Sequence, residues 1–374
     1  MSLVPSLWTV LRCWGRIGCL GFGGPPAHIR LLRELCVDRE RWIDADELED
    51  AIATCNLLPG PSSTQLAIFT AWRVRGPAGA VVGGLAFIVP GLIAILALAA
   101  LFLGGPPEWV LGAGAGAGAA VAAVAVHAGW GLTPASWARR GSTGRWLGYL
   151  AAGALAAALL GPWVVVVLLG CGVLEHLVRR PPRSVSAVIP LAAGAGGTAG
   201  AGVLLSLAWT SFKVGALSYG GGFVIIPLMQ SDAVTEHRWM TGPEFLNAVA
   251  LGQVTPGPVV HTVAVVGYAA AGLAGGLLAA VVAFGPSVVF VLLGGAHFDR
   301  LRTDRRVQAF LAGAGPAAIG AIYGSAVPLA REITHPWQYA VLAGAALALL
   351  ALRRGVVTVL VAAAHVGVAV TLLS

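Results

Sequence analysis

Charged side chains are scarce in this chain. Of its 374 residues only 10% are Asp, Glu, Lys or Arg, and 57% are hydrophobic, whereas about a quarter of the residues in an ordinary soluble domain are charged. Lysine is almost absent, since Lys213 is the only one. A water-soluble fold of this size would lack the polar side chains to cover its surface. Composition therefore excludes a soluble globular protein and predicts residence in a lipid bilayer.

Signatures of enzyme and cofactor sites are also missing. The sequence has no H-E-x-x-H, C-x-x-C, G-x-S-x-G or Walker lysine motif, so no standard metal, redox, nucleophile or ATP site is indicated. The five cysteines have no histidine partner at metal-ligand spacing; they are Cys13, Cys19, Cys36, Cys55 and Cys171. We predict that the protein is not an enzyme and holds no metal and no cofactor.

Long apolar runs are what the chain has instead. Those at 79–103, 147–178 and 272–295 exceed the roughly 20 helical residues that cross a hydrocarbon core. The net charge of +7 comes from short arginine clusters between such runs, for example Arg139 with Arg140 and Arg353 with Arg354. Clusters of this kind are typical of cytoplasmic loops. They indicate orientation in a multi-pass membrane protein, and we expect no nucleic-acid partner.

The sequence contains an internal repeat. Residues 16–67 align with residues 213–264 without a gap, and the identical positions include Trp42/Trp239, Glu47/Glu244 and a Pro-Gly-Pro run at 59–61 and 256–258. Neither tryptophan nor glutamate is common in this chain, so a shared bias toward small apolar residues does not explain the match. Duplication is the better explanation.

Each half has two apolar stretches that glycine or proline interrupts. Proline removes a helix donor and clashes with the preceding turn, so these stretches are not straight spans. In lipid a broken helix is tolerated only where it is buried in protein or lines a wet cavity. Paired interruptions in two halves are typical of a transporter's binding site. They lie at 21–26 and 58–61 in the first half and at 218–222 and 255–258 in the second.

Arginine positions predict how the two copies are oriented. Arginines at 30–41 precede the Pro-Gly-Pro interruption of the first half and Arg73 follows it, so a re-entrant hairpin keeps both groups on the cytoplasmic face. In the second half the corresponding loop, 269–271, is uncharged, and four arginines come one loop later, at 300–306. The second copy is therefore expected upside down.

These inferences give a fold class and a domain plan. We predict an all-α polytopic membrane protein with an inverted-topology repeat, in which broken or re-entrant helices of two helical halves meet in mid-membrane. The expected divisions are an N-terminal transport repeat at 1–183, a linking transmembrane segment at 184–208 and a C-terminal inverted repeat at 209–374. The interruptions at 21–26 and 218–222 fit either hairpins or broken spans, so the number of full spans stays open.

The interruptions predict an anion site. A half-helix that starts after Pro61 presents free N–H groups and a positive dipole, with Ser62 and Ser63 in its first turn. Arg16 and Lys213 align with each other, and each lies five residues before a glycine-rich interruption. An ionisable group in an apolar segment usually marks a substrate path, and two cations would neutralise a doubly charged oxyanion. The alternative for each is snorkelling to a lipid headgroup.

Other polar residues near the interruptions are weaker candidates. Asn56 and Gln253 suit oxyanion oxygens and helix–helix hydrogen bonds about equally, and His261 is more often packed than functional. The complete set of candidate binding residues is Arg16, Gly21, Phe22, Gly23, Gly24, Asn56, Pro59, Gly60, Pro61, Ser62 and Ser63 in the first half, and Lys213, Ser218, Tyr219, Gly220, Gly221, Gly222, Gln253, Thr255, Pro256, Gly257, Pro258 and His261 in the second.

Together the motifs resemble those of the chromate ion transporter family, long-chain two-domain type. The similarity rests on Gly21-Phe22-Gly23-Gly24-Pro25, on Leu58-Pro59-Gly60-Pro61 and on their second copies at 218–222 and 255–258, and it covers nearly the whole chain. It implies chromate export across the bacterial cytoplasmic (inner) membrane, driven by the proton gradient or the membrane potential, with sulfate as the natural look-alike. The implied partners are the oxyanion and the lipid bilayer, and a homodimer is compatible with the sequence.

The resemblance implicates both halves at matching places, but the copies differ. Gly222 stands where the first copy has Pro25, and Thr255 stands where it has Leu58, so equal anion binding by both copies is not assured. A passive oxyanion channel would use similar hydrogen-bond donors along a continuous wet pore. A sulfate transporter would use the same site, because the two dianions are close in size and charge.

Overall fold

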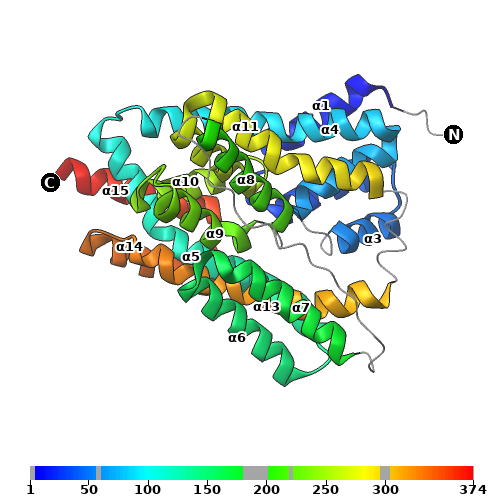
Figure 1. Ribbon diagram of the computed structural model, residues 1–374. Helices are drawn as coiled ribbons and strands as arrows, with labels where there is room; N and C mark the ends of the chain where they lie inside the picture. Colours follow the sequence, from blue (N-terminus) through cyan, green and yellow to red (C-terminus); the bar gives the residue numbers. More distant parts are fainter. Residues whose placement is uncertain (1–4, 56–59, 180–200, 219–221, 295–303, 374) are drawn as a thin grey trace.

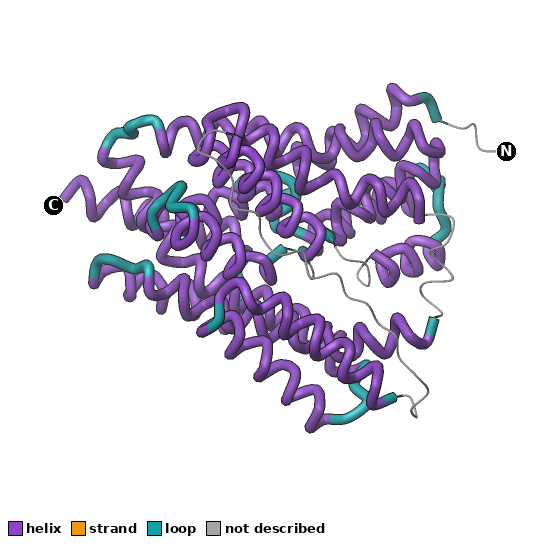
Figure 2. The backbone as a smooth tube through the Cα atoms, viewed as in Figure 1, coloured by secondary structure: helices purple, strands orange, loops and turns teal. Residues whose placement is uncertain are grey.

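All regular structure in the described residues is helical. The computed structural model in Figure 1 describes residues 5–55, 60–179, 201–218, 222–294 and 304–373, and Figure 2 shows no strand in these ranges. The helices of the first half are α1 (Leu7–Leu20), α2 (Pro25–Arg33), α3 (Ala45–Cys55), α4 (Ser62–Leu103), α5 (Glu108–Ala138), α6 (Thr143–Leu159) and α7 (Val164–Val178). The all-α prediction is confirmed.

The second half contains a similar succession of helices. These are α8 (Ala201–Leu217), α9 (Ile226–Gln230), α10 (Gly242–Val254), α11 (Thr262–Gly294), α13 (Arg305–Arg331), α14 (Pro336–Ala346) and α15 (Val356–Leu373). By length and hydropathy five stretches of the described chain could cross a membrane: 62–103, 108–138, 259–294, 305–331 and 356–373. The protein is therefore a multi-pass membrane protein.

Two of these long stretches are helical hairpins rather than straight helices. In α4 the backbone leaves helical geometry at Arg75 and Gly76, where Gly76 has φ +65° and ψ −159°. In α11 it does so at Ala271 and Gly272, where Gly272 has φ +62° and ψ −155°. After the Arg75–Gly76 turn the chain folds back closely, because a Cβ added at Gly79 would clash with the Ala71 carbonyl oxygen. Each therefore has a short first arm and a longer second arm.

The internal repeat extends to backbone detail. A π-helical turn at Glu34–Arg39 recurs at Ser231–Glu236. It is followed in each copy by an arginine with positive φ, +53° at Arg41 and +54° at Arg238. Positive φ is rare outside glycine, so its recurrence at aligned positions shows that both copies fold alike.

The two copies are inverted. Glu47, at the start of α3, forms an ion pair with Arg73. The start of α3 therefore lies at the same end of the molecule as the Arg75–Gly76 turn, where the second arm of α4 begins. The second arm ends at Leu103, at the opposite end of the molecule, and α5 begins shortly after it at Glu108. A Cβ at Gly114 of α5 would lie 2.8 Å from both Asn247 of α10 and Phe102 of α4. Because α10 is the counterpart of α3, the equivalent helices begin at opposite ends of the molecule.

Most of the expected linking segment, 184–208, lies outside the described residues, so the divisions at 183 and 208 remain a prediction.

The apolar run at 147–178 is two helices, α6 and α7, because Gly161 turns the chain with φ +54°. Positive φ is readily available to glycine, which explains why this run does not continue as one span.

The inversion can be tested with a pair of equivalent exposed alanines. Ala78 follows the Arg75–Gly76 turn, and Ala274 follows the Ala271–Gly272 turn one repeat later. In a background without the native cysteines, Ala78→Cys and Ala274→Cys should react with a membrane-impermeant maleimide from opposite faces. Labelling of right-side-out and inverted vesicles measures this, and each variant is the control for the other. Labelling of both from one face would contradict the inverted topology.

Candidate anion-binding site

Reciprocal hydrogen bonds join the interruptions of the two halves. The Gly60 N–H donates to the Ser218 carbonyl oxygen at 2.7 Å, and the Gly257 N–H donates to the Gly21 carbonyl oxygen at 3.0 Å. Gly60 is the counterpart of Gly257, and Gly21 is the counterpart of Ser218. A contact in which i meets j and j meets i is the signature of a two-fold relation. The Pro-Gly-Pro run of each half is thus hydrogen-bonded to the backbone at the start of the glycine-rich interruption of the other half.

Glycine is required where the chains meet. Gly60 has φ +118° and Gly257 has φ +96°, a region that side chains other than glycine rarely adopt. Space is short as well, since a Cβ at Gly257 would lie 2.9 Å from the His261 ring, and one at Gly60 would lie 3.1 Å from the Ser287 hydroxyl. These glycines allow the two backbones to approach closely.

Helix starts converge on the same region. Pro25 begins α2 directly after Gly23 and Gly24, both with positive φ. Ser62 begins α4 with Pro61 as its N-cap, as the sequence predicted, and Ser62 and Ser63 are buried in its first turn. In the second half a 3₁₀ turn at Val259–His261 precedes α11. A helix start supplies unpaired N–H groups and a positive dipole that favour an anion.

Buried polar side chains collect around these starts. Thr64 in the first turn of α4, Ser218 at the end of α8, and Ser287 in the second arm of α11 have hydroxyl oxygens without a hydrogen-bond partner among the described residues. The amide nitrogen of Gln253 in α10 is in the same situation. Buried polar groups normally have partners. Such donors therefore suit a small polar ligand.

The two predicted cations occupy different environments. Arg16 is on the exposed face of α1 and forms no ion pair with another residue in the described part of the chain. Lys213 lies within α8, with its side chain 19% exposed and its Nζ 2.6 Å from Oδ2 of Asp232. The residue that aligns with Asp232 in the first half is Leu35. The counter-ion is thus specific to the second half.

The remaining predicted residues are placed as follows. Phe22 is exposed, whereas Thr255 is buried and donates its hydroxyl hydrogen to the Leu251 carbonyl oxygen. His261 is fully buried with its ring edge-on to Phe284. Gly222 has φ +97° and opens the turn that leads into α9, and Pro256 and Pro258 flank Gly257. Asn56, Pro59, Tyr219, Gly220 and Gly221 lie outside the described residues.

Three residues near this site were not among the predicted binding residues. His28 is fully buried and donates from Nε2 to the Gly21 carbonyl oxygen at 2.8 Å. Ser287 lies beside Gly60, and Asp232 pairs with Lys213. A lone hydroxyl next to Pro286 in an apolar run was a usable signal for Ser287. Nothing local in the sequence links Asp232 to Lys213, which lies in another helix.

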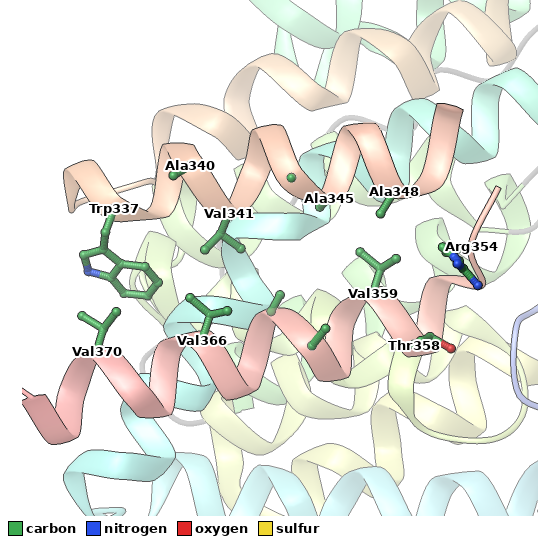
Figure 3. Close-up of a pocket in the computed structure, with 13 residues that line it drawn as sticks. Trp337, Ala340, Val341, Ala345, Ala348, Arg354, Thr358, Val359, Val366 and Val370 are labelled. Atoms are coloured by element: carbon green, nitrogen blue, oxygen red, sulfur yellow. The ribbon is translucent and has the colours of Figure 1, made fainter. Parts of the chain in front are cut away.

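An apolar groove elsewhere does not suit an anion. Figure 3 shows it between α14 and α15, with Trp337 and Val370 at one end and Arg354 and Thr358 at the other. Its volume is about 580 Å³, and its lining is otherwise apolar. None of the four interruptions contributes a residue to it. The site at the interruptions is therefore the better candidate for an oxyanion.

Comparison with known proteins identifies the family. The family model described as Chromate transporter matches residues 8–175 and 205–368, which cover the two halves in turn. The chromate transport protein of Cupriavidus metallidurans is 32% identical over 351 residues, covering 90% of this chain and 85% of that protein. The probable chromate transport protein of Synechococcus elongatus is 30% identical over 346 residues, covering 88% and 86%.

A further relative agrees with these two. The chromate transport protein of Pseudomonas aeruginosa is 30% identical over 340 residues, covering 84% of this chain and 79% of that protein. No solved structure matches the chain. The matches span both inverted copies and all four interruptions, as the sequence motifs predicted. The chain therefore belongs to the chromate transporter family.

Proposed function

We propose that this protein is a secondary active transporter that exports chromate across the bacterial cytoplasmic membrane, driven by the proton gradient or the membrane potential. The reciprocal hydrogen bonds between the interruptions carry the proposal, because they bring helix starts and buried donors of two inverted copies to one place. Inverted repeats that meet at broken helices are the architecture of alternating access. Transport of this kind makes and breaks no covalent bond. The homodimer remains a prediction.

The donor set suits a tetrahedral dianion. The N-terminus of α4 offers backbone N–H groups, and Thr64, Ser218 and Ser287 offer hydroxyl groups from three different helices. Lys213 lies on α8, five residues before Ser218 in the sequence, and contributes a positive charge that is paired with Asp232. Hydrogen bonds to a charged oxygen are worth about 1.5–3 kcal/mol each. Several together replace part of the hydration that the anion loses.

A basic pocket supports entry from the face that carries the arginines. It has a volume of about 470 Å³ between α5, α6 and α13, and Arg139, Arg140 and Arg179 line it. Positive charge gathered in a concave surface raises the local concentration of anions. The positive loops mark the cytoplasmic face, which agrees with export as the direction of transport.

Flux through reconstituted vesicles tests the proposal and ranks the substrates. Purified protein in sealed vesicles should move labelled chromate, with sulfate and molybdate compared side by side under an imposed proton gradient or membrane potential. With the membrane potential clamped, accumulation of chromate driven by the imposed proton gradient is the result expected of a secondary transporter. A passive channel would give flux that does not saturate and never runs uphill. Absence of flux for all three anions would refute the proposed function.

A single hydroxyl provides a sharper test of the site. Thr64→Val keeps the side-chain shape but removes a buried hydroxyl that has no partner among the described residues. If it bonds the oxyanion, the loss of about 1.5–3 kcal/mol should raise KM for chromate about ten- to hundredfold. Thr70→Val, two turns along the same arm, is the matched control, because Thr70 already donates to the Leu66 carbonyl oxygen. Equal KM values for both variants would remove Thr64 from the site.

A further inference from the structure

The groove between α14 and α15 combines a long apolar lining with one cation. Ala340, Gly344 and Val366 are among the residues along its length, and Arg354 and Thr358 stand at one end (Figure 3). Space is available beside Gly344, because a Cβ added there would meet nothing within 4 Å. A groove that is apolar along its length and positive at one end complements a phospholipid with an anionic headgroup.

The groove belongs to the duplicated fold. A second groove lies between α6 and α7, which by their order along the chain are the counterparts of α14 and α15. Each residue that lines it has an equivalent, 192 positions later, among the residues that line the α14–α15 groove. Examples are Gly148 and Ala340, Ala152 and Gly344, and Gly170 and Ala362. A hollow that recurs at equivalent positions is a feature of the architecture.

The two grooves differ in their charged residue. In the α6–α7 groove it is Arg145, which is paired with the buried Glu175 at 2.9 Å. In the α14–α15 groove it is Arg354, which forms no ion pair with another residue in the part of the chain that the structure describes. Its guanidinium is therefore available to a phosphate, which arginine can bind through two N–H groups. The Thr358 hydroxyl adds a further donor.

The charged end lies where headgroups of the cytoplasmic leaflet are expected. The arginines at 300–306 are predicted to be cytoplasmic, and α13 and α14 then run out and back, so the turn with Arg353 and Arg354 returns to that face. From Thr358 to Val370 α15 rises about 18 Å, slightly more than half of a hydrocarbon core of about 30 Å. An acyl chain of that leaflet therefore fits along the groove.

A second copy of the chain is the alternative occupant. A two-fold contact between copies would bring the same surface together from both sides, and two concave surfaces cannot fill each other. An acyl chain is slender enough to lie between the helices, where the lining is mostly alanine and valine. The shape of the groove thus favours a lipid over a second copy.

We propose that the α14–α15 groove binds one anionic phospholipid of the cytoplasmic leaflet, with its phosphate at Arg354 and Thr358 and an acyl chain between the two helices. The phosphate supplies the counter-ion of Arg354, and the chain covers the apolar lining. Both helices pack against α5, so the lipid joins them on the side away from that helix. The α6–α7 groove takes an acyl chain without selecting the headgroup, because the arginine there is already paired.

Native mass spectrometry of the delipidated full-length protein tests the headgroup. Phosphatidylglycerol is the anionic probe, and phosphatidylcholine with the same chains is the zwitterionic one. Arg354→Gln should weaken binding of phosphatidylglycerol about five- to tenfold and leave binding of phosphatidylcholine unchanged. Arg353→Gln is the matched control, because it removes the same charge from the same turn at a residue that does not line the groove.

Filling the groove tests the acyl chain. Gly344→Leu puts a side chain into the space between the helices and should abolish retention of phosphatidylglycerol, whereas Gly285→Leu, at another glycine with open space around it, should not. Glycerol 3-phosphate, which has the charge without the chains, should not compete. Equal phosphatidylglycerol binding in Arg354→Gln and Arg353→Gln, or in both leucine variants, would overturn the proposal. So would a dimer in the same spectra that only Gly344→Leu converts to monomer, because the groove would then hold a second copy.

Discussion

Replacing Gly60 with alanine should strongly reduce oxyanion transport while the protein still inserts into the membrane. The Gly60 backbone has φ +118°, and a residue held in such a region costs about 1–3 kcal/mol. The added Cβ would also clash with the Gln65 amide and lie 3.1 Å from the Ser287 hydroxyl, so these side chains or the Gly60 backbone must move. That energy alone corresponds to about a five- to hundredfold loss, measured as initial chromate flux per inserted protein.

A glycine in open space provides the matched control. Gly285 lies in α11, and a Cβ there would meet nothing within 4 Å. Gly285→Ala should therefore leave flux close to the wild-type value. Gly257→Ala, the equivalent change in the other half, should resemble Gly60→Ala. Normal flux in both Gly60→Ala and Gly257→Ala would mean that the paired interruptions do not form the transport site.

Replacing Glu175 with glutamine should cause the largest loss of stability. The Glu175 side chain is 3% exposed and accepts hydrogen bonds from Arg145 at 2.9 Å, Arg179 at 2.6 Å and Tyr149 at 3.0 Å. It therefore holds α6 to α7. Removing one member of a buried charge network costs about 3–5 kcal/mol, and because both arginines are about 40% exposed we expect about 2–3 kcal/mol. Thermal unfolding in detergent should show a Tm several degrees lower.

An exposed ion pair sets the baseline for that measurement. Glu49 pairs with Arg33, but its side chain is 60% exposed, and exposed pairs contribute about 0–1 kcal/mol. Glu49→Gln should therefore change the Tm little. If Glu175→Gln unfolds at the same temperature as Glu49→Gln, the carboxylate does not hold the α6–α7 hairpin together.

Features carried by local sequence signals were predictable. Glycine and proline mark the interruptions directly, because their backbone preferences are intrinsic to the residue. The helix start at Ser62 and the opposite orientation of the copies followed from Pro61 and from the arginine loops. The duplication was readable because a rare residue such as Trp42 recurs at the aligned position, and the backbone there is the same in both copies.

Side-chain partners across the fold were not predictable in the same way. Arg16 and Lys213 align, and the sequence alone predicted matching roles for them. Their environments differ because Asp232 reaches Lys213 from another helix. The contact of Ser287 with Gly60 likewise depends on how α11 crosses the other half. Such contacts are set by packing between distant segments, which no spacing in one sequence encodes.

The crossed hydrogen bonds of the Pro-Gly-Pro runs have a consequence for the transport cycle. If the proposed transporter alternated by exchanging the conformations of its two copies, Gly60 would still face Ser218 and Gly257 would still face Gly21. The same pair of bonds can thus persist in inward-open and outward-open forms. These backbone contacts can therefore act as a fixed pivot while the rest of each copy tilts around them.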